Sequence, residues 1–122
     1  MYLFGGTSNS EGSDEVLDYD YRFGDSQDLS KMNTVRYDLG YATDSSGRAY
    51  AFGGIGVLED NEIWAGAERY DAASDTWTSI ASMPQALHGL SAVGDGDGHI
   101  FVFGGSTTFD DTGILRNVYS YD

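Results

Sequence analysis

Short runs of apolar and aromatic residues recur along the 122-residue chain and end at glycine, aspartate or serine. Runs of this kind, bounded by turn residues, are typical of β-strands. No stretch keeps the apolar period of about 3.6 residues that marks an amphipathic helix. The pattern therefore predicts an all-β chain with essentially no helix. We expect ten strands, at residues 1–4, 16–21, 27–30, 37–43, 48–52, 67–70, 76–80, 88–94, 99–103 and 117–121.

The apolar runs are copies of one unit. Phe-Gly-Gly occurs at 4–6, 52–54 and 103–105, and each copy is followed by Tyr-Asp, at 19–20, 70–71 and 121–122. The Tyr-Asp pairs are therefore 51 residues apart. Residues 31–54 align with residues 82–105 at this same offset without a gap. A match of this length indicates a structural repeat rather than a chance likeness of glycine-rich sequence.

A period of about 50 residues with aromatic-Gly-Gly, Tyr-Asp and Trp at set offsets resembles the kelch repeat, which forms one four-stranded blade of a β-propeller. Residues 67–105 match best, through Tyr70-Asp71, Trp77, Met83-Pro84 and the final Gly-Gly. The resemblance implies an inner strand, a second strand ending in Gly-Gly, a third ending in Tyr-Asp and an outer strand carrying Trp. Ser26 stands where Trp77 stands one repeat later, so we expect the first outer strand to pack more loosely.

The resemblance implies a single kelch-repeat region over residues 1–122, with a partial blade at 1–30, a full blade at 31–80 and a partial blade at 81–122. Ten strands make two and a half blades, whereas closed propellers have about four to eight. We therefore expect this region to belong to a longer propeller, whose remaining blades cover its terminal faces. Copies of the chain are not expected to tile into a ring, because each junction would lack two strands and leave unpaired sheet edges.

The repeated residues have structural roles in such a blade. Paired glycines let the backbone leave the second strand at dihedral angles that a β-carbon forbids, and tyrosine and tryptophan fill the space between blades while their polar atoms find hydrogen bonds. We assign these roles to Gly5, Gly6, Gly53, Gly54, Gly104, Gly105, Tyr19, Tyr70, Tyr121 and Trp77. Asp95-Gly96-Asp97-Gly98 falls on the same turn as residues 44–47, and a hairpin turn explains both better than a calcium loop does.

Three loops follow the Gly-Gly pairs, at 7–15, 55–66 and 106–116, and we expect them to differ in length and in every position. The blade plan places all three on one rim, and loops on a rigid scaffold commonly carry binding residues. Their apolar residues are Leu58, Trp64, Phe109, Ile114 and Leu115, and their acids are Glu11, Asp14, Glu15, Glu59, Asp60, Glu62, Asp110 and Asp111. The candidate binding residues are Trp64, Phe109, Glu59, Asp60, Glu62, Asp110 and Asp111.

Trp64 is the residue of this set that the blade plan does not explain, because we expect it to have no counterpart at the offset of 51. Two interpretations are open. An exposed tryptophan among acids suits an interface anchor. Alternatively, the indole folds down as a lid on its own loop.

Charge narrows the class of partner. The chain has 20 acidic and six basic residues, for a net charge of −14. This charge repels a phosphate backbone and argues against nucleic-acid binding, whereas it favours a protein partner with a basic surface. There is no cysteine, and the two histidines align with Tyr37 and Arg48, so we expect neither a metal site nor a cofactor. The longest apolar stretch, residues 49–58, is broken by glycines and is far shorter than the about 20 residues of a membrane span.

The resemblance implies a protein-protein interaction module that presents acidic and aromatic loops on one propeller rim, as in ubiquitin-ligase adaptors, actin-associated proteins and adhesion proteins. Two alternatives stay open: a portion of a kelch-fold enzyme, similar to sugar oxidases or sialate mutarotases, and a structural subunit of a filament or large assembly. Kelch-like copper oxidases need a cysteine-crosslinked tyrosine and histidine ligands, and this sequence has neither constellation. The arginines near candidate inner positions are Arg36 and Arg48. We therefore expect no enzyme activity from these residues.

Overall fold

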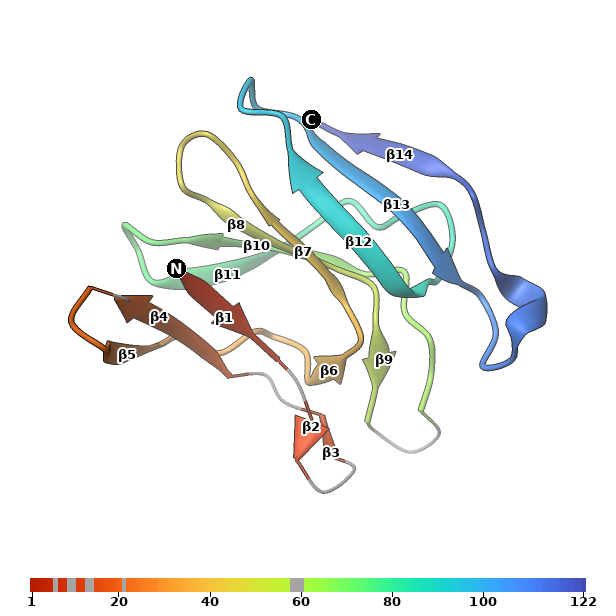
Figure 1. The fold of residues 1–122 in the computed structure, drawn as a ribbon, viewed down its shortest axis with the longest axis horizontal. Coiled ribbons are helices and arrows are strands. Elements are labelled where there is room, and N and C mark those ends of the chain that lie inside the picture. Colours follow the sequence, from red (N-terminus) through yellow and green to blue (C-terminus); the bar gives the residue numbers. More distant parts are fainter. Residues whose placement is uncertain (6, 9–10, 13–14, 21, 58–60) are drawn as a thin grey trace.

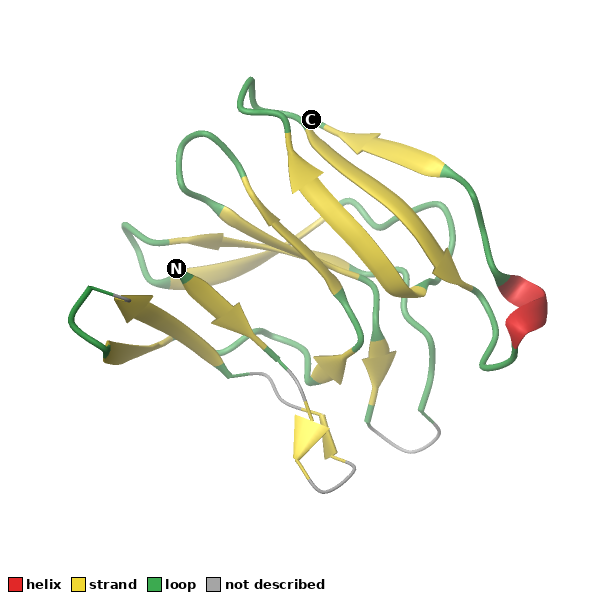
Figure 2. Ribbon diagram, in the orientation of Figure 1, coloured by secondary structure: helices red, strands yellow, loops and turns green. Residues whose placement is uncertain are grey.

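The computed structural model describes residues 1–5, 7–8, 11–12, 15–20, 22–57 and 61–122. These residues form strands and one short 3-10 turn, with no α-helix among them (Figure 2). In chain order the elements are β1 (Tyr2–Phe4), β2 (Thr7–Ser8), β3 (Glu11–Gly12), β4 (Val16–Asp20), β5 (Asp25–Leu29), β6 (Arg36–Tyr37), β7 (Gly40–Thr43), β8 (Ala49–Phe52), β9 (Ile55–Gly56), β10 (Ala67–Asp71), β11 (Thr76–Ile80), β12 (His88–Gly94), β13 (Ile100–Ser106), η1 (Asp111–Gly113) and β14 (Val118–Tyr121).

Three antiparallel sheets make up most of the fold (Figure 1). The first sheet has the order β1-β4-β5, the second β11-β10-β8-β7 and the third β12-β13-β14. Two small pairs, β2-β3 and β6-β9, lie beside them. The prediction of an all-β chain is therefore confirmed, and the second sheet has the four strands of a kelch-type blade. The described residues form fourteen strands, of which ten lie in the three main sheets, so the expected total of ten is wrong. The strand predicted at 37–43 is divided between β6 and β7, because Asp38 has a positive φ of 55°. The pairs β2-β3 and β6-β9 and the turn η1 were not predicted as such.

One hydrogen-bonding register runs through the second and third sheets. Ala42 lies opposite Tyr50 in the pair β7-β8, and Val93 lies opposite Phe101, the residues 51 positions later, in the pair β12-β13. The pairs β8-β10 and β13-β14 correspond in the same way. The sequence offset is therefore also a structural offset, and residues 51 positions apart have the same place in their sheets.

Apolar side chains fill the two spaces between successive sheets. Between the first and second sheets, Tyr70 is buried against Tyr2 and Trp77, at ring-centroid distances of 5.8 and 5.3 Å. Its hydroxyl donates to the Asp75 carboxylate at 2.7 Å, and the Trp77 indole N–H donates to the carbonyl of Ser30 at 2.9 Å. Large amphipathic rings thus pack between sheets while their polar atoms stay hydrogen-bonded.

The space between the second and third sheets holds the larger cluster, which includes Phe52, Leu87 and Ile100, with Tyr121 packed against it. Tyr121 lies 5.9 Å from Phe52, ring centroid to ring centroid. The remaining tyrosine of the predicted set, Tyr19, lies in β4. Its neighbour across the sheet is Ser26, and β5, which lacks the tryptophan, is exposed over most of its length.

Equivalent positions on the second and third sheets differ in burial. Phe52 is 1% exposed and Ala67 is 3% exposed, whereas their counterparts Phe103 and Val118 are 40% and 64% exposed. The difference arises because the third sheet covers one face of the second sheet. The third sheet presents the matching apolar face to solvent.

The two positions that follow β8 require glycine, both for their backbone conformation and because a side chain would not fit there. Gly53 and Gly54 have φ angles of +58° and +96°, in the left-handed region that disfavours side chains. A β-carbon on Gly53 would lie 2.3 Å from the carbonyl oxygen of Leu87, and one on Gly54 would lie 2.6 Å from that of Tyr37. The same positive φ recurs at Gly5, Gly104 and Gly105, while Gly6 lies outside the described residues.

Candidate partner-binding rim

The loops that follow β1, β8 and β13 leave from the same side of the sheets, opposite the hairpin turns β4–β5, β7–β8 and β12–β13 (Figure 1). Each loop is closed at its base by one equivalent hydrogen bond. Gly5 N–H donates to the carbonyl of Glu15 at 3.0 Å, Gly53 N–H to that of Gly66 at 2.9 Å, and Gly104 N–H to that of Asn117 at 3.2 Å. We call the surface formed by these three loops the rim.

The second and third rim loops share a frame as well as a base. Gly56 N–H donates to the Glu62 carbonyl at 2.9 Å, and 51 residues later Thr107 N–H donates to the Gly113 carbonyl at 3.1 Å. Isolated bridges Ile55–Ile63 and Ser106–Ile114 correspond in the same way. These two loops therefore have the same length, and the isoleucine of the bridge recurs at positions 63 and 114. The prediction that the three loops differ in length and in every position is wrong. The different residues in them hid a common backbone.

Trp64 belongs to this shared frame. Its N–H donates to the Gly54 carbonyl at 2.9 Å, and the N–H of Leu115, 51 residues later, donates to the Gly105 carbonyl at 2.9 Å. The prediction that Trp64 has no counterpart is therefore wrong. The side chain is half-buried, and its indole lies over Gly56, where an added β-carbon would be 2.7 Å from Nε1. This geometry favours the lid over the exposed anchor.

Phe109 and Ile114 are the exposed apolar residues of the third rim loop, at 63% each. The turn between them is held by Asp110, which caps η1. Its carboxylate accepts from the N–H and hydroxyl of Thr112 and from the hydroxyl of Thr108. These hydrogen bonds, those from Thr112 foremost, lower the pKa of Asp110. Asp110 therefore orders the loop that presents the two apolar side chains.

The other predicted acids divide between described and undescribed residues. Glu62 is exposed on the second rim loop. Asp111 opens η1, and nothing is described of its side chain. Glu59, Asp60 and Leu58 lie outside the described residues. The fold thus places Phe109, Asp110 and Asp111 on one loop and Glu62 on the neighbouring loop.

His88, at the start of β12, joins the rim to the second sheet, and the sequence did not single it out. Its Nδ1 lies 2.8 Å from the Asp38 carboxylate, and its Nε2 lies 2.9 Å from the carbonyl of Thr108. The ring of Phe109 packs on the imidazole at a centroid distance of 5.5 Å. Partial burial opposes the charged imidazolium, but the Thr108 carbonyl and Asp38 outweigh it and raise the pKa of His88 above the ordinary 6.5.

Comparison with known proteins identifies the repeats. No family model matches the chain. The chain is 40% identical to β-scruin of Limulus polyphemus over 79 residues, and 32% identical to Kelch-like protein 38 of Mus musculus over 121 residues. It is also 34% identical to an F-box/kelch-repeat protein of Arabidopsis thaliana over 97 residues. The chain carries kelch repeats.

The similar regions cover most of this chain and a small part of each relative. They cover 62%, 98% and 80% of the chain, and 8%, 20% and 25% of β-scruin, Kelch-like protein 38 and the F-box/kelch-repeat protein. The three sheets described above are accordingly kelch-type propeller blades, and their Gly-Gly and Tyr-Asp pairs are the repeat's recurring features.

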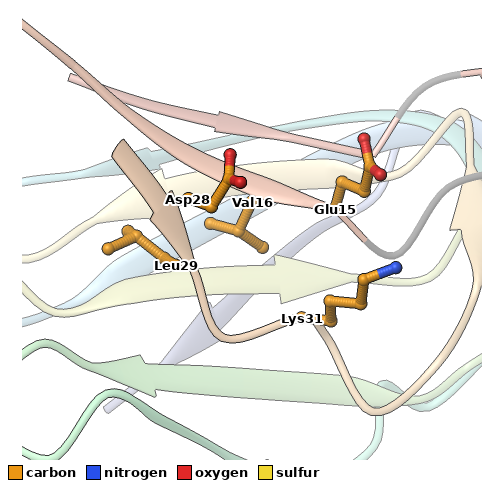
Figure 3. Close-up of a pocket in the computed structure, with 5 residues that line it drawn as sticks. All are labelled: Glu15, Val16, Asp28, Leu29 and Lys31. Carbon is orange, nitrogen blue, oxygen red and sulfur yellow. The ribbon is translucent and has the colours of Figure 1, made fainter. Parts of the chain in front are cut away.

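Two cavities among the described residues of these kelch blades are small. One, of about 110 Å³, lies beside β4 and β5 and is lined by Glu15, Val16, Asp28, Leu29 and Lys31. The charged ends of Glu15 and Lys31 lie on the same side of it (Figure 3). Another, of about 230 Å³, lies between β7 and β12. Both are below the roughly 300 Å³ at which pockets for small molecules begin, so the rim is the better candidate for recognition.

The two arginines considered for a mutarotase-like site do not share an inner surface. Arg36 is 0% exposed within the second kelch blade, whereas Arg48 lies at the β7–β8 turn, 3.4 Å from the Asp44 carboxylate. Among the described residues, no group of three or more His, Asp or Glu side chains is arranged to hold a metal ion. No helix in the described part of the chain is long and apolar enough to cross a membrane.

Arg36 instead forms a buried ion pair with Glu68, which is 3% exposed. Its Nη1 donates to the carbonyls of Gly53 and Gly66, at 3.1 and 3.0 Å, at the base of the second rim loop. Nη2 lies 2.9 Å from Glu68 Oε1 without hydrogen-bond geometry, and Nε has no acceptor. Burial lowers the pKa of Arg36 from its usual value, and the charge of Glu68 partly offsets this effect. The pair supports the rim from below and does not face it.

Proposed function

We propose that these kelch blades form part of a protein-interaction module whose partner binds at the rim, with Phe109 and Ile114 as apolar contacts and the neighbouring acids selecting a basic surface. The observation that carries the proposal is the pair of side chains, each 63% exposed, on a loop whose backbone is fixed by the Asp110 cap and by hydrogen bonds at both ends. Exposed aromatic groups on an ordered loop lose little conformational entropy on binding, which favours their use as anchors.

The comparisons support the class of function. Two of the relatives are named as an F-box/kelch-repeat protein and a Kelch-like protein, and none of the three names denotes an enzyme. The chain covers a quarter or less of each relative. We therefore infer the class of partner from the rim of this chain and not from the partners of the relatives. The enzyme and filament alternatives stay predictions from the sequence.

The charge of the rim supports the class of partner. Glu62 is exposed on the second rim loop and Asp110 on the third, and the whole chain carries a net charge of −14. An acidic field accelerates encounter with a basic partner and disfavours acidic ones. Trp64 does not enter the proposal as an anchor, because its indole packs on its own loop.

The proposal can be tested by selecting binders from a random peptide display library against the intact protein and measuring their dissociation constants. We expect the selected peptides to be rich in Lys and Arg and to carry an apolar residue. Phe109→Ser should weaken binding by about 30-fold, the loss of a hot-spot residue. Glu62→Lys should weaken binding less, and mainly at low salt.

Matched control positions lie in the hairpin turns at the opposite end of the sheets. Phe23, 75% exposed in the β4–β5 turn, supplies Phe23→Ser, and the exposed Asp97 in the β12–β13 turn supplies Asp97→Lys. Neither change should alter binding. Peptides without basic residues, or an equal loss from Phe23→Ser, would contradict the proposal.

A further inference from the structure

We propose that His88 acts as a charged clamp that holds the third rim loop against the second kelch blade, and that its deprotonation releases Phe109 from its ordered position. The clamp itself is a property of the fold. Its effect on recognition rests on the proposed function, because it acts through the Phe109 loop.

The hydrogen-bond partners of His88 require a doubly protonated ring. A carboxylate and a backbone carbonyl can only accept hydrogen bonds, and His88 has Asp38 on Nδ1 and the Thr108 carbonyl on Nε2. A neutral imidazole carries one N–H, so it can make one of the two bonds and not both. Both bonds exist together only in the imidazolium, which therefore links the second blade to the rim loop.

The two segments that His88 links, which carry Asp38 and Thr108, are far apart in the sequence. Asp38 lies between β6 and β7 of the second blade, and Thr108 lies beyond β13, with His88 between them at 17% side-chain exposure. Phe109 packs on the imidazole face at 5.5 Å, where a positive charge attracts the aromatic ring. Loss of the charge therefore weakens a hydrogen bond and an aromatic contact at the same time.

The neighbouring repeats of this sequence do not supply the residues of the clamp. One repeat earlier, Tyr37 occupies the position of His88, and the position equivalent to Asp38 one repeat later is Gly89. Gly89 has a φ of +62° and Asp38 keeps a φ of +55°, a conformation that aspartate tolerates better than most side chains. The repeat's backbone is thus retained at Asp38, and a carboxylate is added there that reaches His88.

The pH dependence follows from the charges that face the ring. From the second blade, the carboxylate of Asp38 faces the imidazole ring. In the rim loop, the Asp110 carboxylate accepts hydrogen bonds from Thr108 and Thr112 instead. Because the folded pKa of His88 is raised, its contribution is complete below the ordinary value of 6.5 and is lost as the pH rises through the folded pKa.

The clamp can be tested in the intact protein by following the ¹³C-labelled histidine rings by NMR, together with hydrogen exchange of the amides at 107–116. His88 should titrate above its ordinary pKa. After correction for intrinsic exchange chemistry, opening of the loop should increase by about tenfold across that titration, as expected for losing a hydrogen bond to a charged group.

Two variants separate the clamp from simple packing. Asp38→Asn should lower the pKa of His88 and move the loop transition to the same lower pH, which loss of packing alone would not do. His88→Gln should abolish the pH dependence of the loop, and His99→Gln, at an exposed histidine on the opposite rim, should leave it unchanged. If His88→Gln fails to fold, the Asp38→Asn titration still decides the matter.

A loop whose opening does not follow the His88 titration, or a transition that stays in place in Asp38→Asn, would overturn the clamp. Its failure is distinct from that of the proposed function. Peptide binding at pH 6 that depends on Phe109, with a loop insensitive to pH, would remove the clamp and keep the rim. If the loop follows the titration of His88 but peptide binding does not depend on Phe109, the clamp stands and the proposed binding rim is wrong.

Discussion

Replacing Arg36 by leucine should destabilise the second blade more than any surface change, because it leaves the buried Glu68 carboxylate without its ion-pair partner. The Glu68 side chain is 4% exposed. Leucine is the matched replacement, since Leu87 occupies the same position one repeat later and is 0% exposed. The blade plan therefore accepts an apolar side chain there, and the cost of the change comes from the stranded charge.

The magnitude follows from the contacts of the pair. Removing one partner of a buried ion pair costs about 3–5 kcal/mol, and the carbonyls of Gly53 and Gly66 also lose a donor. The pair itself is imperfect, because Nη2 meets Glu68 without hydrogen-bond geometry and Nε has no acceptor. Glu68→Gln in the Arg36→Leu background should therefore recover about 2 kcal/mol, because it removes the charge and keeps an oxygen for the Asn33 N–H.

Urea unfolding of the wild type, both single variants and the double variant gives the free energies of a double-mutant cycle. In thermal unfolding, we expect Arg36→Leu alone to lower the midpoint temperature by about 10 °C or more. We expect the cycle to show a coupling of more than about 2 kcal/mol between the two positions. A cost below about 1 kcal/mol for Arg36→Leu, or strictly additive single changes, would refute this reasoning.

Three further predictions concern the repeat. Gly54→Ala should lower the free energy of unfolding by more than about 2 kcal/mol, because its β-carbon would meet a backbone carbonyl at 2.6 Å. Gly47 has a φ of +81° with open space around it, so Gly47→Ala should cost only the backbone strain of about 1 kcal/mol. Denaturant unfolding of the two variants compares these costs. Phe52→Ala should lower the free energy of unfolding by about 3–5 kcal/mol. If a further blade covers the third sheet, Phe103→Ala should lower it by as much in the intact protein. A loss of stability less than half as large from Phe103→Ala would contradict the presence of that blade. Trp64→Ala should lower the free energy of unfolding by about 2 kcal/mol or more through lost packing on its own loop, and unchanged stability with weakened peptide binding would restore the anchor interpretation.

The strands could be predicted because local pattern and repeat agreed. The runs 76–80 and 88–94 coincide with β11 and β12, because each is a short apolar run of strand length that ends near turn residues. The small pair β6-β9 was missed because its strands have two residues each, too few for a periodic signal. The equivalence of Trp64 and Leu115 could have been found from the offset, but their unlike side chains concealed a common backbone hydrogen bond.

The contacts that shape the rim could not be predicted, because they join residues distant in sequence. Arg36 meets Glu68 across the second blade, and the offset places Leu87 and Tyr119 at the equivalent positions, so the repeat carries no signal for the pair. His88 lies 50 residues from Asp38 and 20 from Thr108. The first contact depends on how distant segments of one blade fold together, and the second depends on how two blades pack. Side-chain type and spacing encode neither arrangement.

The most direct test of the account is site-specific photo-crosslinking in the intact protein, with the photoreactive residue at position 109, 114 or 23. Positions 109 and 114 are on the rim, and position 23, at the opposite end of the sheets, is at least as exposed as they are. We predict that one partner with a basic surface is captured from 109 and 114 and not from 23. Capture of the same partner from 23 alone would contradict the assignment of the rim as the binding surface.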